Sequence, residues 1–245
     1  MAETFRKEIR VTEPECDYHR RMFLSDIMRH AQQMGSDHLL ARGLDYRRMY
    51  EDGMVFLVNK LLITINRRPT FGERLALTTI PKRPKGAQFV RDTLFETPEG
   101  EKLVEVSISW MLIDPATRKI LRPAAFDVYG FDMFPNDGEY ITRYRIRRPE
   151  GQGTLHLRQV KFSDLDYNRH VNNAVYADMV CDLLPADLML SREPRRFGVM
   201  FEHEATLGQV IEMETLPLEE GEGFYVGGKV TGSRCFEAEL AFAEI

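Results

Sequence analysis

The stretch DLDYNRHVNN, residues 164–173, places several hydrogen-bonding side chains around one histidine, directly before an apolar helical pattern. Asp166, Asn168 and His170 stand at alternate positions, so on an extended loop their side chains point the same way. Imidazole exchanges a proton near neutral pH, and a carboxylate and an amide are suitable groups to orient it. The stretch therefore favours acid–base chemistry, although a structural loop with Asp166 capping a turn is the alternative.

The backbone after this histidine offers a second kind of chemical group. If a helix begins near residue 171, its first N–H groups lack partners inside the helix and face the same region. Such groups, aided by the helix dipole, can bind an oxygen that gains negative charge in a reaction. The residues concerned are Val171, Asn172 and Asn173, and simple capping of the helix by the asparagines is the alternative.

The chain contains two similar halves. CDYHRRMFLSDIMRHAQQM, which begins at residue 16, aligns without a gap with LDYNRHVNNAVYADMVCDL, which begins at residue 165. Asp17 matches Asp166, but His19 and Arg21 stand where the second copy has Asn168 and His170. We therefore expect the first half to keep the shape of the second half and to have lost its chemistry.

The order of secondary structure is also repeated. Each copy follows one strand pattern and precedes a helix and four more strand patterns. Helices are expected at 24–42, ended by Gly43, and at 171–184, stopped by Pro185. The strands are expected at 4–11, 54–66, 73–81, 88–96, 102–113, 154–162, 196–205, 209–216, 223–231 and 235–243. This order predicts an α+β fold of two domains, 1–126 and 154–245, each with an antiparallel sheet wrapped around a long helix. Turn residues and charge at 127–153 indicate the linker.

Composition narrows the class of protein. The net charge of -5 gives no general attraction to nucleic acid, and 43% hydrophobic residues suffice for a full core. Three distant cysteines fit a reducing cytoplasm, and neither a signal peptide nor a membrane-spanning stretch is recognisable, so we expect a cytoplasmic protein. No phosphate loop or metal-binding spacing is present, so neither a cofactor nor a metal is expected.

SDLDYNRHVNNAVYADMV resembles the catalytic signature of the acyl-ACP thioesterases, a family with a tandem hot-dog fold. ITINRRPTFGERLALTTIPKRPKG and SISWMLIDPATRKILRP are similar to the N-terminal domain of that family, so the likeness, to the bacterial type, covers nearly the whole chain. The resemblance implies hydrolysis of the thioester that joins a fatty acyl chain to acyl carrier protein, which ends chain elongation. Because that carrier is acidic, basic clusters at 82–85 and 143–148 are expected to form a docking collar.

The resemblance also assigns residue roles. It places catalytic functions on Asp166, Asn168, His170 and, within the expected strand FEHEATLGQ, on Glu204, with Glu202 as the rival. Plant members carry a cysteine directly after this glutamate, where this chain has Ala205, so we expect water activated by Glu204 and no acyl-enzyme.

An apolar tunnel for the acyl chain is expected in the first half. Its substrate-binding residues would include Met34 and Trp110, although such residues are more often plain core. An acyl-CoA thioesterase of the same fold and a non-catalytic acyl-binding module are the competing functions. A homodimer is possible, and the preferred chain length and saturation do not follow from the sequence.

Overall fold

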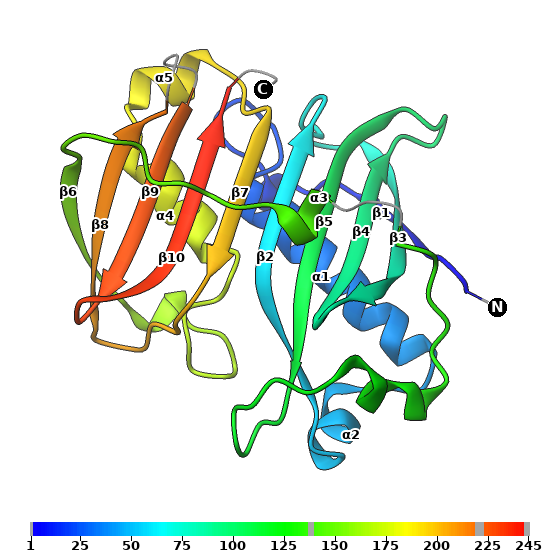
Figure 1. Ribbon diagram of the computed structural model, residues 1–245. Coiled ribbons are helices and arrows are strands. Elements are labelled where there is room, and N and C mark those ends of the chain that lie inside the picture. The colour runs from blue at the N-terminus through cyan, green and yellow to red at the C-terminus, as the bar shows by residue number, and fades with distance from the viewer. Residues whose placement is uncertain (1, 137–139, 219–222, 243–245) are drawn as a thin grey trace.

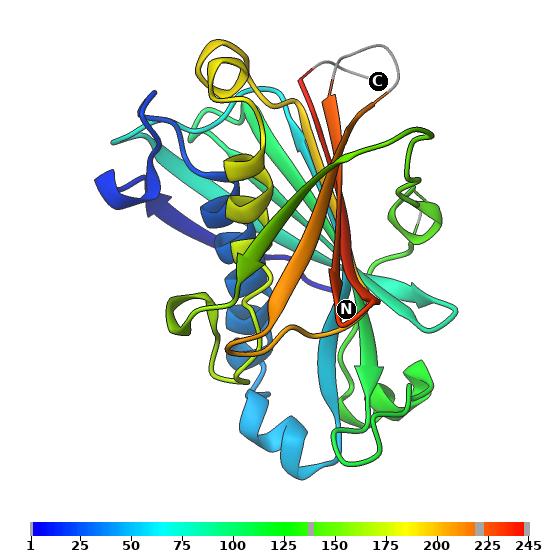
Figure 2. The same cartoon turned by 90° about the vertical axis from the view of Figure 1, so that its left-hand side faces the viewer.

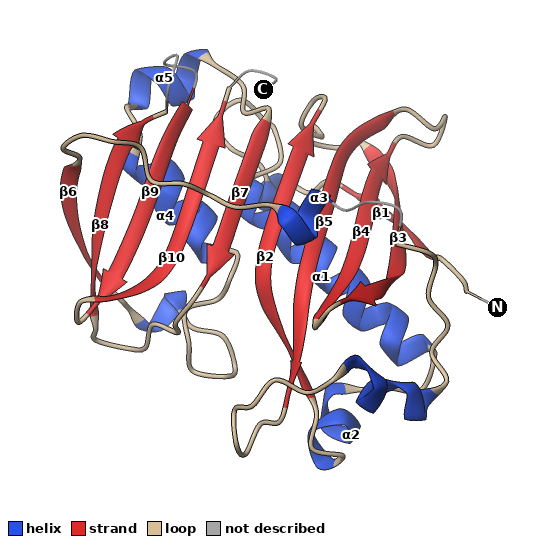
Figure 3. Ribbon diagram, in the orientation of Figure 1, coloured by secondary structure: helices blue, strands red, loops and turns tan. Residues whose placement is uncertain are grey.

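The structure is a computed structural model that describes residues 2–136, 140–218 and 223–242. The described residues form one antiparallel sheet of ten strands (Figures 1 and 3). The strands are β1 (Phe5–Arg10), β2 (Val55–Ile65), β3 (Arg74–Lys85), β4 (Gln88–Glu96), β5 (Lys102–Ile113), β6 (Thr154–Gln159), β7 (Arg196–Phe201), β8 (Val210–Pro217), β9 (Gly223–Val230) and β10 (Ser233–Ala241). Their order across the sheet is β1-β3-β4-β5-β2-β7-β10-β9-β8-β6, so each half of the chain supplies one side. The antiparallel pair β2–β7 joins the two sides.

Two long helices cover one face of this sheet (Figure 2). They are α1 (Leu24–Ala41) and α4 (Val175–Leu183), and they contact each other across the junction of the halves. Alternate strand residues point toward the helices and form a single core that contains Ile27 of α1, Ala177 of α4 and Phe197 of β7, each 0% exposed. The predicted α+β architecture, with one long helix against an antiparallel sheet in each half, is confirmed.

Several element boundaries differ from the expectation, and two of these differences bear on the site described below. Helix α4 begins at Val175, four residues late, because the Val171 N–H donates to the Ala205 carbonyl in a neighbouring loop. Strand β7 ends at Phe201, since the N–H groups of Glu202 and His203 both point to the Cys235 carbonyl and the chain then leaves the ladder. The short helix α5 (Ala186–Ser191) follows Pro185. Of the shorter elements, α2 (Tyr46–Glu51) bears on the site described below.

The segment between the halves crosses the opposite face of the sheet (Figure 1). It includes α3 (Tyr140–Arg143) and packs Ile141, Tyr144 and Ile146 over Leu62 of β2. Lys60, 1% exposed, donates to the carbonyls of Thr142 and Tyr144 at 3.1 and 3.2 Å. The segment is therefore fixed over the β2–β7 junction. Among the described residues, no helix is long and apolar enough to cross a membrane.

Candidate active site

The loop that precedes α4 is a closed turn. The Asp166 carboxylate accepts hydrogen bonds from the N–H groups of Asn168 at 2.8 Å and His170 at 3.5 Å. The Asp166 N–H donates to the His170 carbonyl at 2.9 Å, and Arg169 has a positive φ of 67°. Asp166 therefore holds the backbone of the loop. The loop is thus not the extended backbone from which the convergence of the three alternate side chains was expected.

The first half contains the same turn. Asp17 accepts from the N–H groups of His19 and Arg21 at 2.9 and 3.0 Å, and its own N–H donates to the Arg21 carbonyl at 2.9 Å. Arg20 has a positive φ of 60°, close to the 67° of Arg169 in the second copy. The aspartate thus performs the same structural task in the half that lacks the histidine.

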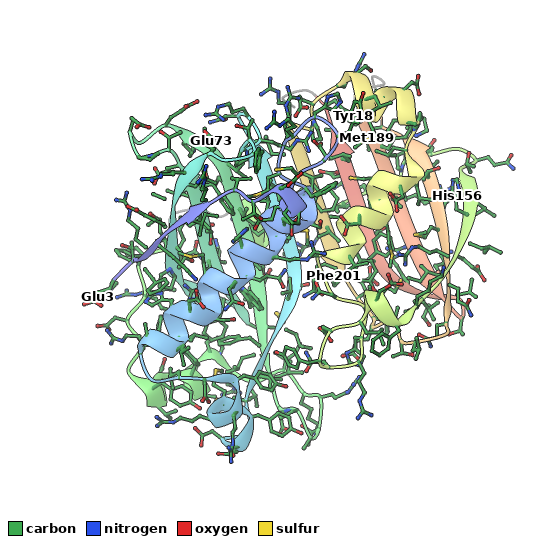
Figure 4. The ribbon with its side chains drawn as sticks, turned by 180° about the vertical axis from the view of Figure 1, so that it is seen from behind. Glu3, Tyr18, Glu73, His156, Met189 and Phe201 are labelled. Atoms are coloured by element: carbon green, nitrogen blue, oxygen red, sulfur yellow. The ribbon has the colours of Figure 1, made fainter. Side chains whose placement is uncertain are left out.

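His170 faces Glu204 across two adjacent loops. His170 Nε2 lies 3.3 Å from Glu204 Oε2, and their side chains are 28% and 34% exposed. A backbone bridge between His170 and Thr206 holds the loops together. Glu204 lies in the loop after β7 and not on a strand, three residues beyond Phe201, which Figure 4 labels near the middle of the molecule. Glu202 instead contacts Arg234 at 3.5 Å, so the geometry favours Glu204 over Glu202.

The first half contributes to the same site. Arg118 Nη2 lies 3.0 Å from Glu204 Oε2. The Tyr46 hydroxyl of α2 donates to Asn168 Oδ1 at 3.4 Å, and the rings of Tyr46 and Tyr167 meet edge to face at 5.6 Å. Arg118 and Tyr46 were not expected as site residues. Both lie far from residues 166–204 in the sequence, so no motif or residue spacing indicates the contact. The site therefore lies at the interface of the two halves.

Most of the backbone N–H groups directly after His170 already donate hydrogen bonds within the protein. Val171 donates to the Ala205 carbonyl at 2.9 Å and Asn172 to the Asp164 carbonyl at 2.8 Å, so the expectation of unpaired donors is wrong for both. The Asn172 side chain caps the Ala174 N–H at 2.9 Å, and the Asn173 amide contacts Gln32 of α1 at 3.4 Å. Within the described ranges, no acceptor is found for the Asn173 backbone N–H. That N–H remains available to a ligand.

The residues expected to bind the acyl chain lie where α1 packs on the sheet. Met34 of α1 is 2% exposed and belongs to the common core. Trp110 of β5 is partly buried, with its ring 6.5 Å from that of Phe56. Its Nε1 is buried without a hydrogen-bond partner in the described part of the chain. The role of both residues in binding remains a prediction.

The cysteines are unsuited to nucleophilic attack. Burial raises the pKa of Cys181 to about 12 and that of Cys235 to about 11. Both side chains are therefore thiols at neutral pH, whereas the thiolate is the nucleophile. This agrees with the expectation of no cysteine route.

The predicted basic collar is partly paired within the protein. Lys82 forms an ion pair with Asp92, and Arg148 contacts both oxygens of Glu214 at 2.8 and 2.7 Å. Arg145 donates to backbone carbonyls and has no carboxylate in these contacts. The charges of Lys82 and Arg148 are thus locally neutralised, which weakens their part in a docking surface.

Solved structures of other proteins share the fold of this chain. An acyl-ACP thioesterase from Bacteroides thetaiotaomicron matches with a TM-score of 0.86 and 21% identity, covering 98% of each chain. The 12:0-ACP thioesterase from Umbellularia californica matches with a TM-score of 0.86 and 18% identity, covering 98% of this chain and 97% of that one. The fold is therefore the tandem hot-dog fold of thioesterases.

Matches to models of protein families identify the family of this chain. The acyl-ACP thioesterase N-terminal domain matches residues 2–125, and the C-terminal domain matches residues 147–244. The chain belongs to the acyl-ACP thioesterase family. The chloroplastic acyl-[acyl-carrier-protein] hydrolase FATB2 of Cuphea viscosissima is 23% identical over 235 residues, which cover 90% of this chain. The chloroplastic palmitoyl-acyl carrier protein thioesterase of Arabidopsis thaliana is 20% identical over 224 residues, which cover 86%. This chain spans 57% and 54% of the lengths of these relatives.

Proposed function

We propose that this protein hydrolyses the thioester between a fatty acyl chain and acyl carrier protein, and that residues 154–245 supply the catalytic groups. The observation that carries the proposal is the pair of His170 and Glu204, 3.3 Å apart, on the loops that enclose the start of α4. Family membership and the names of the relatives support the same reaction.

The reaction requires a base, an oxyanion site and a proton for the leaving sulfur. Glu204 takes a proton from water as the water oxygen bonds to the thioester carbonyl carbon. The carbonyl electron pair moves onto oxygen, where the Asn173 N–H and the Asn168 amide are suitable donors. The carbon–sulfur bond then breaks, and His170 protonates the departing sulfur and is reprotonated by Glu204. The products are a fatty acid and a thiol, and no acyl-enzyme forms.

Residues 1–126 would bind the acyl chain between α1 and the sheet, and 127–153 would link the two domains. Met34 and Trp110 lie there, and the flexible thioether of Met34 can adjust to a ligand in a packed interior. The unpartnered Trp110 Nε1 adds a donor that an oxygen of the substrate can satisfy. A non-catalytic module would have no use for a histidine–carboxylate pair in addition to a binding site for the acyl chain.

The carrier would approach the exposed cations of the loops around the site. Arg118 and Lys119 lie on the loop that contacts Glu204, and Arg169 lies on the loop of His170. All three are exposed and can attract an acidic carrier, in contrast to the paired members of the collar.

Hydrolysis rates on acyl-ACP and acyl-CoA thioesters of graded length test the proposal. The expected result is a kcat/KM for acyl-ACP that exceeds the value for acyl-CoA of the same acyl chain. A higher value for acyl-CoA at every length would identify an acyl-CoA thioesterase, and no turnover of either would identify a binding module.

A further inference from the structure

We infer that Arg118 is a positioning residue for catalysis, through which the first domain holds the Glu204 carboxylate in place. This inference rests on the proposed function, because it assigns Arg118 a part in the same reaction. Arg118 Nη2 lies 3.0 Å from Glu204 Oε2, the oxygen that also faces His170 Nε2 at 3.3 Å. Glu204 is thus held from two sides, by one group from each domain.

The hairpin that carries Arg118 is rigidly built. The Asp114 carboxylate accepts from the N–H groups of Ala116 and Thr117 at 2.8 and 3.0 Å, and the Arg118 N–H donates to the Asp114 carbonyl at 2.8 Å. Arg118 itself has a positive φ of 56°, a backbone conformation that costs a side-chain-bearing residue free energy and that Gly or Asn usually occupies. The turn therefore fixes the direction in which this side chain leaves the backbone.

Glu204 needs such support because its own loop gives it little. Its carboxylate is 34% exposed and lies beyond the end of β7, outside the ladder that fixes strand residues. Among the described residues, Arg118 and His170 are the groups that contact it. Without Arg118 the carboxylate can rotate away from the water it must activate, which lowers the fraction of reactive geometry.

The first half shows the same kind of cross-domain contact with the charges exchanged. There the loop bridge pairs Arg21 with Thr70, as His170 pairs with Thr206, so Arg68 stands where the second half has Glu204. The Arg68 guanidinium contacts Asp17 at 2.7 Å and, from the other domain, Glu193 at 3.0 Å. In both halves, the charged residue two positions before the bridge is held by an opposite charge from the other domain.

An exposed arginine beside an active site can also act by attracting the acidic carrier, and the test must separate these roles. We therefore choose Arg118→Met, Glu204→Gln and the double variant, with Lys119→Ala as the matched control. Lys119 is the neighbouring exposed cation, and no ion pair joins it to Glu204 in the described part of the chain. Steady-state kcat and KM are measured on an acyl-ACP and on the uncharged acyl-N-acetylcysteamine thioester.

Positioning predicts that Arg118→Met lowers kcat about ten-fold or more on both substrates, while KM on the uncharged substrate changes little. In the Glu204→Gln background, Arg118→Met should cause no further loss, because the two residues act as a unit. Added guanidinium ion at millimolar concentration should restore part of the activity of a further variant, Arg118→Ala. Lys119→Ala should keep the wild-type kcat on the uncharged thioester, which involves no docking of the carrier.

Three results would overturn the inference. The first is an effect of Arg118→Met confined to KM for acyl-ACP, which indicates docking. The second is additivity of Arg118→Met with Glu204→Gln. The third is a wild-type protein that hydrolyses neither substrate, which would remove the proposed function as well. If the wild-type protein is active only on the small thioester, the assignment of acyl carrier protein as the carrier is wrong. The effect of Arg118→Met on kcat can still be measured on that thioester.

Discussion

Asp166 is expected to hold the shape of its loop, and its negative charge is not expected to be needed for catalysis. Asp166→Ala removes the acceptor of the 2.8 Å bond from Asn168 and the weaker 3.5 Å bond from His170. Loss of a comparable cap costs about 1 kcal/mol, which lowers Tm by about 3 °C in a chain of this size. Displacement of His170 should lower kcat by about 10²-fold. Asp166→Asn retains an oxygen acceptor and should keep kcat within about five-fold of wild type.

Thermal unfolding and acyl-ACP hydrolysis of the same preparations check this prediction. Asp17→Ala is the matched control, because Asp17 makes the equivalent bonds at 2.9 and 3.0 Å in the half without the histidine. It should lower Tm at least as much as Asp166→Ala does, because it also removes the ion pair with the buried Arg68, and it should leave kcat near the wild-type value. An Asp166→Asn enzyme as inactive as Asp166→Ala would show that the negative charge of Asp166 takes part in catalysis, and would refute the structural role.

Three further predictions concern pH, salt and thiols. Burial, then Arg91 and Arg42, lowers the pKa of His38 to about 4, so the unfolded chain binds the proton more readily. The free energy of unfolding should therefore fall by at most about 3 kcal/mol as the pH drops from about 6.5 to about 4, and His38→Gln should flatten this dependence in denaturant titrations. Added salt should lower kcat/KM for acyl-ACP more steeply than for the uncharged thioester, and parallel salt curves would contradict steering by surface cations. Cys181→Ala should keep at least about half of the wild-type kcat in the same assay, because a thiol with a pKa of about 12 contributes no thiolate; inactivation without unfolding would contradict this.

Local patterns were sufficient to predict most of the sheet and the first helix. The bounds expected for β4 and β5 agree with those of the structure, because the turn residues TPEG at 97–100 separate the two strands. Helix α1 ends one residue before the expected position, since Gly43 adopts the positive φ of 75° that terminates helices. The match between Asp17 and Asp166 correctly indicated two copies of one loop, as their hydrogen bonds show.

Contacts between distant segments could not be predicted in this way. The start of α4 depends on a bond from Val171 to the Ala205 carbonyl, and no property of the helix itself indicates that bond. The approach of Arg118 to Glu204 depends on the β2–β7 pairing that joins the two sides of the sheet. The orientation of Asp166 depends on the positive φ of Arg169, which residue type alone does not indicate. The residue types of the site were thus available from the sequence, and their partners required the fold.

The most direct test of the account is the kcat of Glu204→Gln with acyl-ACP. Glutamine nearly matches glutamate in shape, can still contact His170 and Arg118, and cannot take a proton from water. If Glu204 is the general base, kcat should fall by about 10²-fold or more, KM should change little, and the protein quenched during turnover should carry no acyl group. A Glu204→Gln enzyme with a near-normal kcat, or an acyl group covalently bound to the wild-type protein during turnover, would contradict direct attack by water.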